Sequence, residues 1–125
     1  AQILMILALE SEEKEDPDLV RAMGGLNGGL GFSGRVCGAL TGGCCFLSYF
    51  LGKGEAEELE DPEAALLIGR LAEWFEETTK SKYGGCSCRE ILDGDPRNKF
   101  QRCPELVEAV YHKCVELLQE KGGIP

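Results

Sequence analysis

The stretch from residue 36 to residue 51 contains no charged side chain, and it constrains the fold more than any other feature of the sequence. It reads VCGALTGGCCFLSYFL. Sixteen uncharged residues exceed the ordinary length of a β-strand, so the stretch predicts a buried helix. Its small residues would let neighbouring backbones approach closely; they are Gly38, Ala39, Gly42 and Gly43. We therefore expect a central helix with the rest of the chain packed around it.

The segments on both sides of this stretch also have helical patterns. Residues 1–10 are apolar nearly all round, which indicates a buried helix. Asp16-Pro17 and Asp61-Pro62 each place a capping aspartate before a proline at the first helical position. The helix expected from Asp61 onward has apolar residues at three-and-four spacing. They are Ala64, Leu67, Ile68, Leu71, Trp74 and Phe75.

The C-terminal part predicts one short and one long helical segment. Residues 89–92 are expected to form a single turn before an Asp-Gly-Asp-Pro turn, and Pro104 is expected to open the last helix. Gly122-Gly123 is expected to close that helix. No segment alternates as a strand would. The predicted fold is all-α, a compact bundle of four to five helices, with residues 1–125 as a single domain.

Charge and hydropathy restrict the class of partner. The chain has 22 acidic and 13 basic residues and a formal charge of -9. Such a surface repels phosphate backbones, so we expect no nucleic-acid partner. The apolar run 3–9 is too short to span a bilayer and lacks a basic flank, so we expect no membrane or export signal. The chain begins at Ala1 in what resembles mid-helix, so we expect further residues upstream.

Seven cysteines are several times the ordinary usage, and their number is odd. An odd count disfavours a framework made only of disulfides, and a domain of 125 residues does not need such a framework. We therefore expect reduced thiols that bind metal or carry electrons, in a reducing compartment such as the cytoplasm. The positions are 37, 44, 45, 86, 88, 103 and 114.

Three of these cysteines fall where helices are predicted to begin. Cys37 joins a glycine-rich loop to the central helix, Cys88 opens the turn at 89–92, and Cys103 stands at the N-cap before Pro104. Free N–H groups and the helix dipole at such positions favour a thiolate. We interpret Cys37, Cys88 and Cys103 as one redox or metal site.

The other cysteines are assigned differently. Cys86 is two residues from Cys88 in an extended segment, so the two side chains should point opposite ways. Cys86 is an alternative candidate for a fourth metal ligand. Cys44, Cys45 and Cys114 lie on apolar helix stretches and are interpreted as core residues. The absence of C-x-x-C excludes the thioredoxin and zinc-knuckle motifs and covalent haem. Three or four cysteines from distant segments remain able to hold an iron–sulfur cluster or zinc.

The loop from residue 24 to residue 34 contains six glycines and suggests a competing hypothesis. Gly29, Gly31 and Gly34 fit G-x-G-x-x-G, a nucleotide-binding fingerprint. That fingerprint needs a preceding strand and a βαβ unit, which this sequence does not predict, so we expect no nucleotide. We instead expect these glycines, with Gly38, to bring backbone N–H groups close to Cys37 or to the cofactor it binds.

The order of these motifs resembles the C_GCAxxG_C_C family. The segment GGLGFSGRVCGALTGG matches its multi-glycine loop and its cysteine-glycine-alanine-x-x-glycine element, which here begins at Cys37. In this comparison Cys88 and Cys103 are similar to the third and fourth family cysteines. The family's first cysteine begins the N-terminal helix. Here that position falls just before Ala1, so this ligand either lies upstream or is missing from this member.

The resemblance implies a redox role without an established reaction. Cys37, Cys88 and Cys103, with the upstream cysteine or Cys86, would hold an iron–sulfur cluster or zinc for electron transfer to a redox partner protein. One alternative uses the same thiols as a dithiol/disulfide pair, without metal. Another is a helical interaction module for an oxidoreductase or transporter. Dimerisation through the uncharged stretch is a further expectation.

Overall fold

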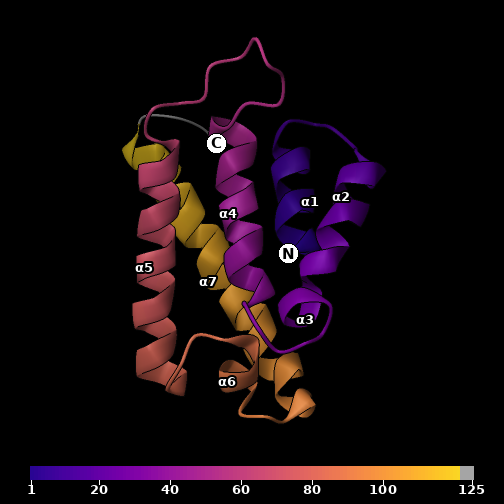
Figure 1. Ribbon diagram of the computed structural model, residues 1–125, viewed down its shortest axis with the longest axis vertical. Helices are drawn as coiled ribbons and strands as arrows, with labels where there is room; N and C mark the ends of the chain where they lie inside the picture. The colour runs from indigo at the N-terminus through magenta and orange to yellow at the C-terminus, as the bar shows by residue number, and fades with distance from the viewer. Residues whose placement is uncertain (122–125) are drawn as a thin grey trace.

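Four long helices form a bundle with α4 at its centre. The structure is a computed structural model and describes residues 1–121, so the expected helix stop at Gly122-Gly123 lies outside the described residues. α4 contacts each of the other three long helices (Figure 1). The prediction of a central helix in the uncharged stretch is therefore confirmed. The four helices are α1 (Gln2–Ser11), α4 (Gly38–Leu51), α5 (Ala64–Tyr83) and α7 (Lys99–Glu120).

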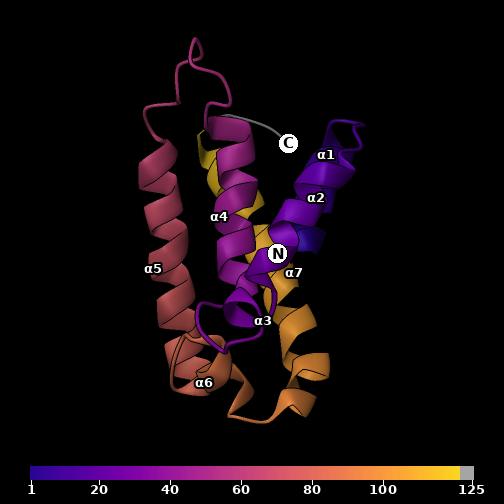
Figure 2. The same cartoon turned by 45° about the vertical axis from the view of Figure 1, so that its right-hand side comes forward.

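Shorter elements connect these helices and gather largely at one end of the bundle. Figure 2 shows α3, α6 and the start of α7 at the end opposite the loop that joins α4 to α5. The described part of the chain contains no strand, only an isolated bridge, so the all-α prediction is confirmed. The short elements are α2 (Pro17–Met23), the 3₁₀ turn Gly24–Leu26, α3 (Asn27–Leu30), α6 (Cys88–Leu92) and the 3₁₀ turn Pro96–Asn98.

Small residues explain why α4 can pack on three neighbours. A Cβ added at Gly43 would lie 2.5 Å from Cγ1 of Val110 in α7 and 2.9 Å from Cδ2 of Leu71 in α5. Real Cβ atoms do not approach this closely, so only glycine admits both neighbouring helices. The sequence GG at positions 42–43 therefore sets the distance between α4 and its neighbours.

The core is apolar and extends through the whole bundle. Leu67, Leu71 and Phe75 of α5 are buried, as their spacing predicts. The one buried hydroxyl among the described core positions, on Thr79, donates to the carbonyl of Phe75 at 2.7 Å. Within residues 1–121, no helix is both long and apolar enough to cross a membrane.

The start of the last helix differs from the prediction. α7 begins at Lys99, so Pro104 lies inside it and Cys103 is a helical residue rather than an N-cap. The chain enters the helix through an earlier Asp-Pro pair, in which the Asp95 carboxylate accepts from the N–H of Arg97. Pro104 removes one donor, and the carbonyl it would have bonded belongs to Phe100, a 79% exposed residue that water can reach.

Candidate functional site

Three cysteines from distant segments line one cavity at the end of the bundle where α3, α6 and the start of α7 meet. They are Cys37, Cys88 and Cys103, and the cavity has a volume of about 450 Å³. All three are free thiols. The remaining wall is mainly backbone and apolar side chains. It consists of Ala1, Asn27, Gly28, Phe32, Ser33, Gly34, Gly38, Ala39, Arg89, Leu92, Gly94, Pro96, Lys99, Leu106 and Val107.

Cys37 is the N-cap of α4, as the sequence predicts, and is the most buried of the three cavity cysteines. Burial raises the pKa of its thiol, while the N–H groups of Ala39 and Leu40 act in the opposite direction by hydrogen bonding to the sulfur. Burial outweighs these donors. The expectation that the helix start makes Cys37 a ready thiolate is therefore wrong in direction, because the same packing that places the thiol also desolvates it.

Main-chain hydrogen bonds join the glycine-rich loop to α6 and so place Cys88 beside Cys37. The N–H of Cys88 donates to the carbonyl of Arg35 at 2.6 Å, and the N–H of Arg89 donates to the carbonyl of Gly34 at 3.0 Å. An isolated antiparallel bridge pairs Val36 with Ser87. The segments that carry the two cysteines are thus joined mainly through backbone atoms.

Gly29 is required for this contact between the loop and α6. It has φ of +76°, and an added Cβ would lie 2.8 Å from the Cβ of Cys88 and 2.6 Å from the backbone nitrogen of Arg35. Any other residue would meet both the steric cost of the left-handed region and a collision with backbone. Gly29 therefore lies directly behind Cys88 and supports its position.

The other candidate glycines lie in different places. Gly34 and Gly38 line the cavity, whereas Gly31 is not among its lining residues. The loop also uses several N–H groups internally: those of Gly31, Phe32, Gly34 and Arg35 donate to loop carbonyls at 3.1 Å. These four groups are therefore not free to bind a ligand. The expectation of ligand-binding donors is therefore wrong for Gly31 and Gly34, whose N–H groups bond within the loop.

Cys88 is the first residue of α6, the position predicted from the sequence. Ser87 caps this helix: its hydroxyl accepts from the N–H of Glu90, and the Glu90 carboxylate accepts from the N–H of Ser87. Partial burial raises the pKa of the Cys88 thiol. The cap fixes the first turn of α6 and with it the direction in which Cys88 enters the cavity.

Cys103 reaches the cavity from the second turn of α7. Burial and the nearby Cys88 raise the pKa of its thiol, and the ammonium group of Lys99 acts in the opposite direction. Lys99, Leu106 and Val107 also line the cavity, at helical spacings of four, three and four residues from Cys103. The sequence interpretation missed them because it began the helix at Pro104. The signal was present, since Asp95-Pro96 is a third copy of the Asp-Pro helix start.

The remaining cysteines lie away from this cavity. Cys86 is half-buried against the hydrophobic core and is not among the cavity residues. Cys114 is fully buried, and its thiol donates weakly to the carbonyl of Gly43 at 3.6 Å. Cys44 and Cys45 are half-buried and pack against the core. The core assignment of these last three residues agrees with their surroundings.

The donor set has the chemistry of a soft-metal site without its spacing. Thiolates are the ligands that zinc and iron–sulfur clusters prefer. Over residues 1–121, however, no three His, Cys, Asp or Glu side chains lie close enough together to hold one metal ion. As arranged here, the three cavity thiols do not form a metal centre.

The fold and site define a class: a small all-α protein with several free cysteines gathered at one end of a helical bundle. The chain belongs to the C_GCAxxG_C_C family, since the family model described as "Putative redox-active protein (C_GCAxxG_C_C)" matches residues 1–117. The resemblance seen in the sequence is thereby confirmed. No curated protein and no solved structure matches the chain.

Proposed function

We propose that this protein is a cysteine-based redox protein whose working centre consists of Cys37, Cys88 and Cys103. The observation that carries the proposal is that these thiols, 51 and 15 residues apart in sequence, line a single cavity. The family description, with its redox-active label, supports the same class of function. Two forms of the centre use these thiols.

The first form is thiol–disulfide exchange, which the spacing of the thiols favours. Cys103 is the entry thiol, because Lys99 stabilises its thiolate and the side chain also lines a second groove beside the cavity. Its thiolate attacks a partner disulfide, forms a mixed disulfide and releases one partner thiolate. The Cys88 thiolate then attacks the Cys103 sulfur and releases the second partner thiolate. Two electrons thereby pass from the cysteine pair to the partner disulfide.

The second form is an iron–sulfur cluster or zinc bound by the same three cysteines, which the donor chemistry favours. A cluster would supply one-electron storage for transfer to a redox partner protein in a reducing compartment. Burial of Cys37 raises its thiol pKa, so a bound cation is the means by which this thiol becomes a thiolate at neutral pH. This form requires the three side chains to move closer together than they are here.

One experiment tests the proposal and separates its forms. The protein is purified anaerobically, its ultraviolet–visible spectrum is recorded, and iron, zinc and acid-labile sulfide are quantified. The thiols are then counted before and after oxidation by a small disulfide and re-reduction. Stoichiometric iron with charge-transfer bands supports the cluster, and zinc alone supports a structural metal site.

Metal-free protein that loses and regains two thiols supports exchange. The disulfide must then map to cysteines of the cavity by peptide mass spectrometry. A protein with no metal and with thiols inert to oxidation would overturn the proposal. That result would leave a helical interaction module with structural cysteines as the explanation of the fold.

A further inference from the structure

The charge of the cavity is opposite to the charge of the protein. The chain carries 22 acidic and 13 basic residues. Of the side chains that line the cavity, those of Arg89 and Lys99 are charged, and none carries a carboxylate. Random placement on so acidic a chain would favour carboxylates at the wall. The cavity is therefore a local positive site on a negatively charged surface.

These two cations have no carboxylate partner in the described part of the chain. Neither is in an ion pair within 4.0 Å. The Arg89 guanidinium donates to the backbone carbonyl of Ser33 at 3.1 Å, which orients it without neutralising it. The Lys99 ammonium lies 5.4 Å from the ring centroid of Phe100. Both positive charges remain available to an anion.

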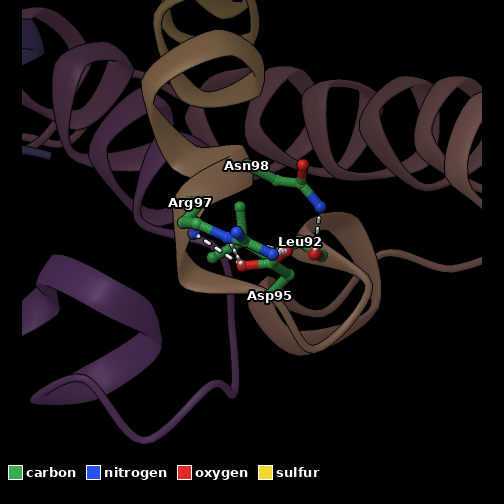
Figure 3. Close-up of polar contacts among 4 residues, drawn as sticks. All are labelled: Leu92, Asp95, Arg97 and Asn98. Carbon is green, nitrogen blue, oxygen red and sulfur yellow. Dashed lines mark hydrogen bonds and ion pairs between the residues drawn. The ribbon is translucent and has the colours of Figure 1, made fainter.

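Two of the acidic residues that are near in sequence, Glu90 and Asp95, are engaged elsewhere. Glu90 accepts from the N–H of Ser87 in the capping box. Asp95 forms an ion pair with Arg97 at 2.9 Å, and the amide of Asn98 donates to the carbonyl of Leu92 at 2.7 Å (Figure 3). These contacts shape the turn between α6 and α7, which supplies Gly94 and Pro96 to the cavity wall.

The size and the other walls fit a small organic molecule. The volume of about 450 Å³ is within the range of ordinary ligand pockets. Apolar side chains of Leu92, Leu106 and Val107 line it together with the three thiols. A ligand that matches these walls has an apolar or sulfur-containing body and a negative charge at its edge.

We propose that the substrate class of this cavity is the small anionic organic disulfide, for example one that carries carboxylate groups. The inference rests on the exchange form of the proposed function. Arg89 and Lys99 bind the carboxylates and direct the disulfide to Cys103. The Cys103 thiolate then forms a mixed disulfide and releases one carboxylate-bearing thiolate. Attack by the Cys88 thiolate on the Cys103 sulfur releases the second carboxylate-bearing thiolate. The substrate is thereby reduced and the cysteine pair is oxidised.

The test compares three small disulfides that differ mainly in charge. They are dithiodipropionate, which is dianionic, hydroxyethyl disulfide, which is neutral, and cystamine, which is dicationic. The rate of mixed-disulfide formation on the reduced full chain is followed by mass spectrometry. Each rate is divided by the rate of the same disulfide with a small neutral thiol, which removes differences in leaving-group pKa. We expect the anion to react about tenfold faster than the neutral compound, and this preference to fall as salt is added.

Matched variants assign the preference to the cavity. Arg89→Gln and Lys99→Gln should each reduce the anion-to-neutral ratio by roughly threefold, whereas Lys99→Arg should retain it. Lys53→Gln removes an equal charge in the loop between α4 and α5, at the opposite end of the bundle, and should leave the ratio unchanged. Thermal unfolding of each variant checks that the fold is intact.

The outcomes separate this inference from the function on which it rests. Equal normalised rates for all three disulfides, or a ratio as low in Lys53→Gln as in Lys99→Gln, would overturn the anionic substrate class and leave thiol exchange standing. Failure of all three disulfides to react would overturn the exchange form and the inference together.

Discussion

The bundle contains two groups of three cysteines, which differ in the segments they come from and in whether they line a cavity. Cys37, Cys88 and Cys103 come from distant segments and line a cavity. The second group, here called the interior group, consists of Cys44 and Cys45 of α4 and Cys114 of α7, which pack in or against the hydrophobic core. There Cys114 is fully buried, and desolvation raises the pKa of its thiol to about 12.

The difference shows that the presence of cysteines alone does not identify the proposed redox site. Each group contains a well-buried thiol, so burial does not separate them. What separates them is access: the first group faces space that a reactant can enter, next to Lys99 and Arg89. The second group fills space between helices, as small hydrophobic residues do.

The largest expected effect is the loss of reversible redox chemistry in the cavity group. Cys88→Ser and Cys103→Ser should each abolish the two-thiol oxidation, because a serine hydroxyl cannot form a disulfide. Cys44→Ser is the matched change in the interior group, and this variant should retain the two-thiol oxidation. Thiol counting by mass spectrometry after oxidation and re-reduction measures the effect. Equal loss in Cys44→Ser would remove the distinction between the groups.

A change beside the interior group should alter stability instead. Gly43→Ala forces a methyl group against Val110 and Leu71 and should lower the free energy of unfolding by about 1–3 kcal/mol. Gly69→Ala is the control in α5, where no atom lies within 4 Å of the added Cβ. It should raise stability by roughly 0.5–1 kcal/mol. Urea unfolding measures both, and a neutral result for Gly43→Ala would contradict the close packing of α4.

The interior group should also give stability a dependence on alkaline pH. Below about pH 9 the Cys114 thiol is protonated in both the folded and the unfolded chain. Between pH 9 and about pH 12 the unfolded chain loses this proton while the folded protein keeps it. The free energy of unfolding therefore falls by about 1.4 kcal/mol per pH unit from this thiol. Urea unfolding between pH 8 and pH 10.5 should show a shallower fall in Cys114→Ser, and identical slopes would mean that the thiol is not desolvated.

The smallest expected effect concerns the support of the cavity group. Ser87→Ala removes the cap of α6 and should cost about 1 kcal/mol of stability. It should also increase the alkylation rate of Cys88, because the first turn of α6 loosens. Ser87→Asp retains a capping acceptor and should show neither change. Iodoacetamide labelling followed by peptide mass spectrometry measures the rate, and an unchanged Cys88 would show that the main-chain contacts alone hold this thiol.

The architecture was predictable because its signals are local. The uncharged stretch predicted a central helix, the end of the glycine-rich loop marked Cys37 as a helix start, and Cys88 was expected to open the turn at 89–92. The register of α7 was not predicted, because Pro104 is a strong helix-start signal and the structure instead uses the weaker-looking Asp95-Pro96. Both Pro104 and Asp95-Pro96 are valid helix-start signals. Packing decides between them, and a local sequence pattern carries no information about packing.

The properties of the candidate site were less predictable than its members. The helix start at Cys37 indicates a stabilised thiolate, yet burial reverses the direction of the pKa shift. The glycine loop indicates free donors, yet the described loop bonds to itself. The contributions of Arg89 and Lys99 to the cavity depend on how α6 meets α7. The first reversal comes from packing between segments distant in sequence, whereas the second comes from hydrogen bonds within the loop itself, such as that from the N–H of Gly31 to the carbonyl of Gly25.

The backbone pairing between the glycine-rich loop and α6 affects which substitutions this site can accept during evolution. Because carbonyls and N–H groups of residues 34–36 and 87–89 make the connection, most side chains there can be replaced without separating Cys37 from Cys88. Gly34 within these residues and Gly29 behind Cys88 are exceptions, since both have a positive φ and little room for a side chain. Main-chain contacts thus fix the relative positions of Cys37 and Cys88. Side chains of the cavity wall can therefore change, and with them the ligand, while the thiols stay in place.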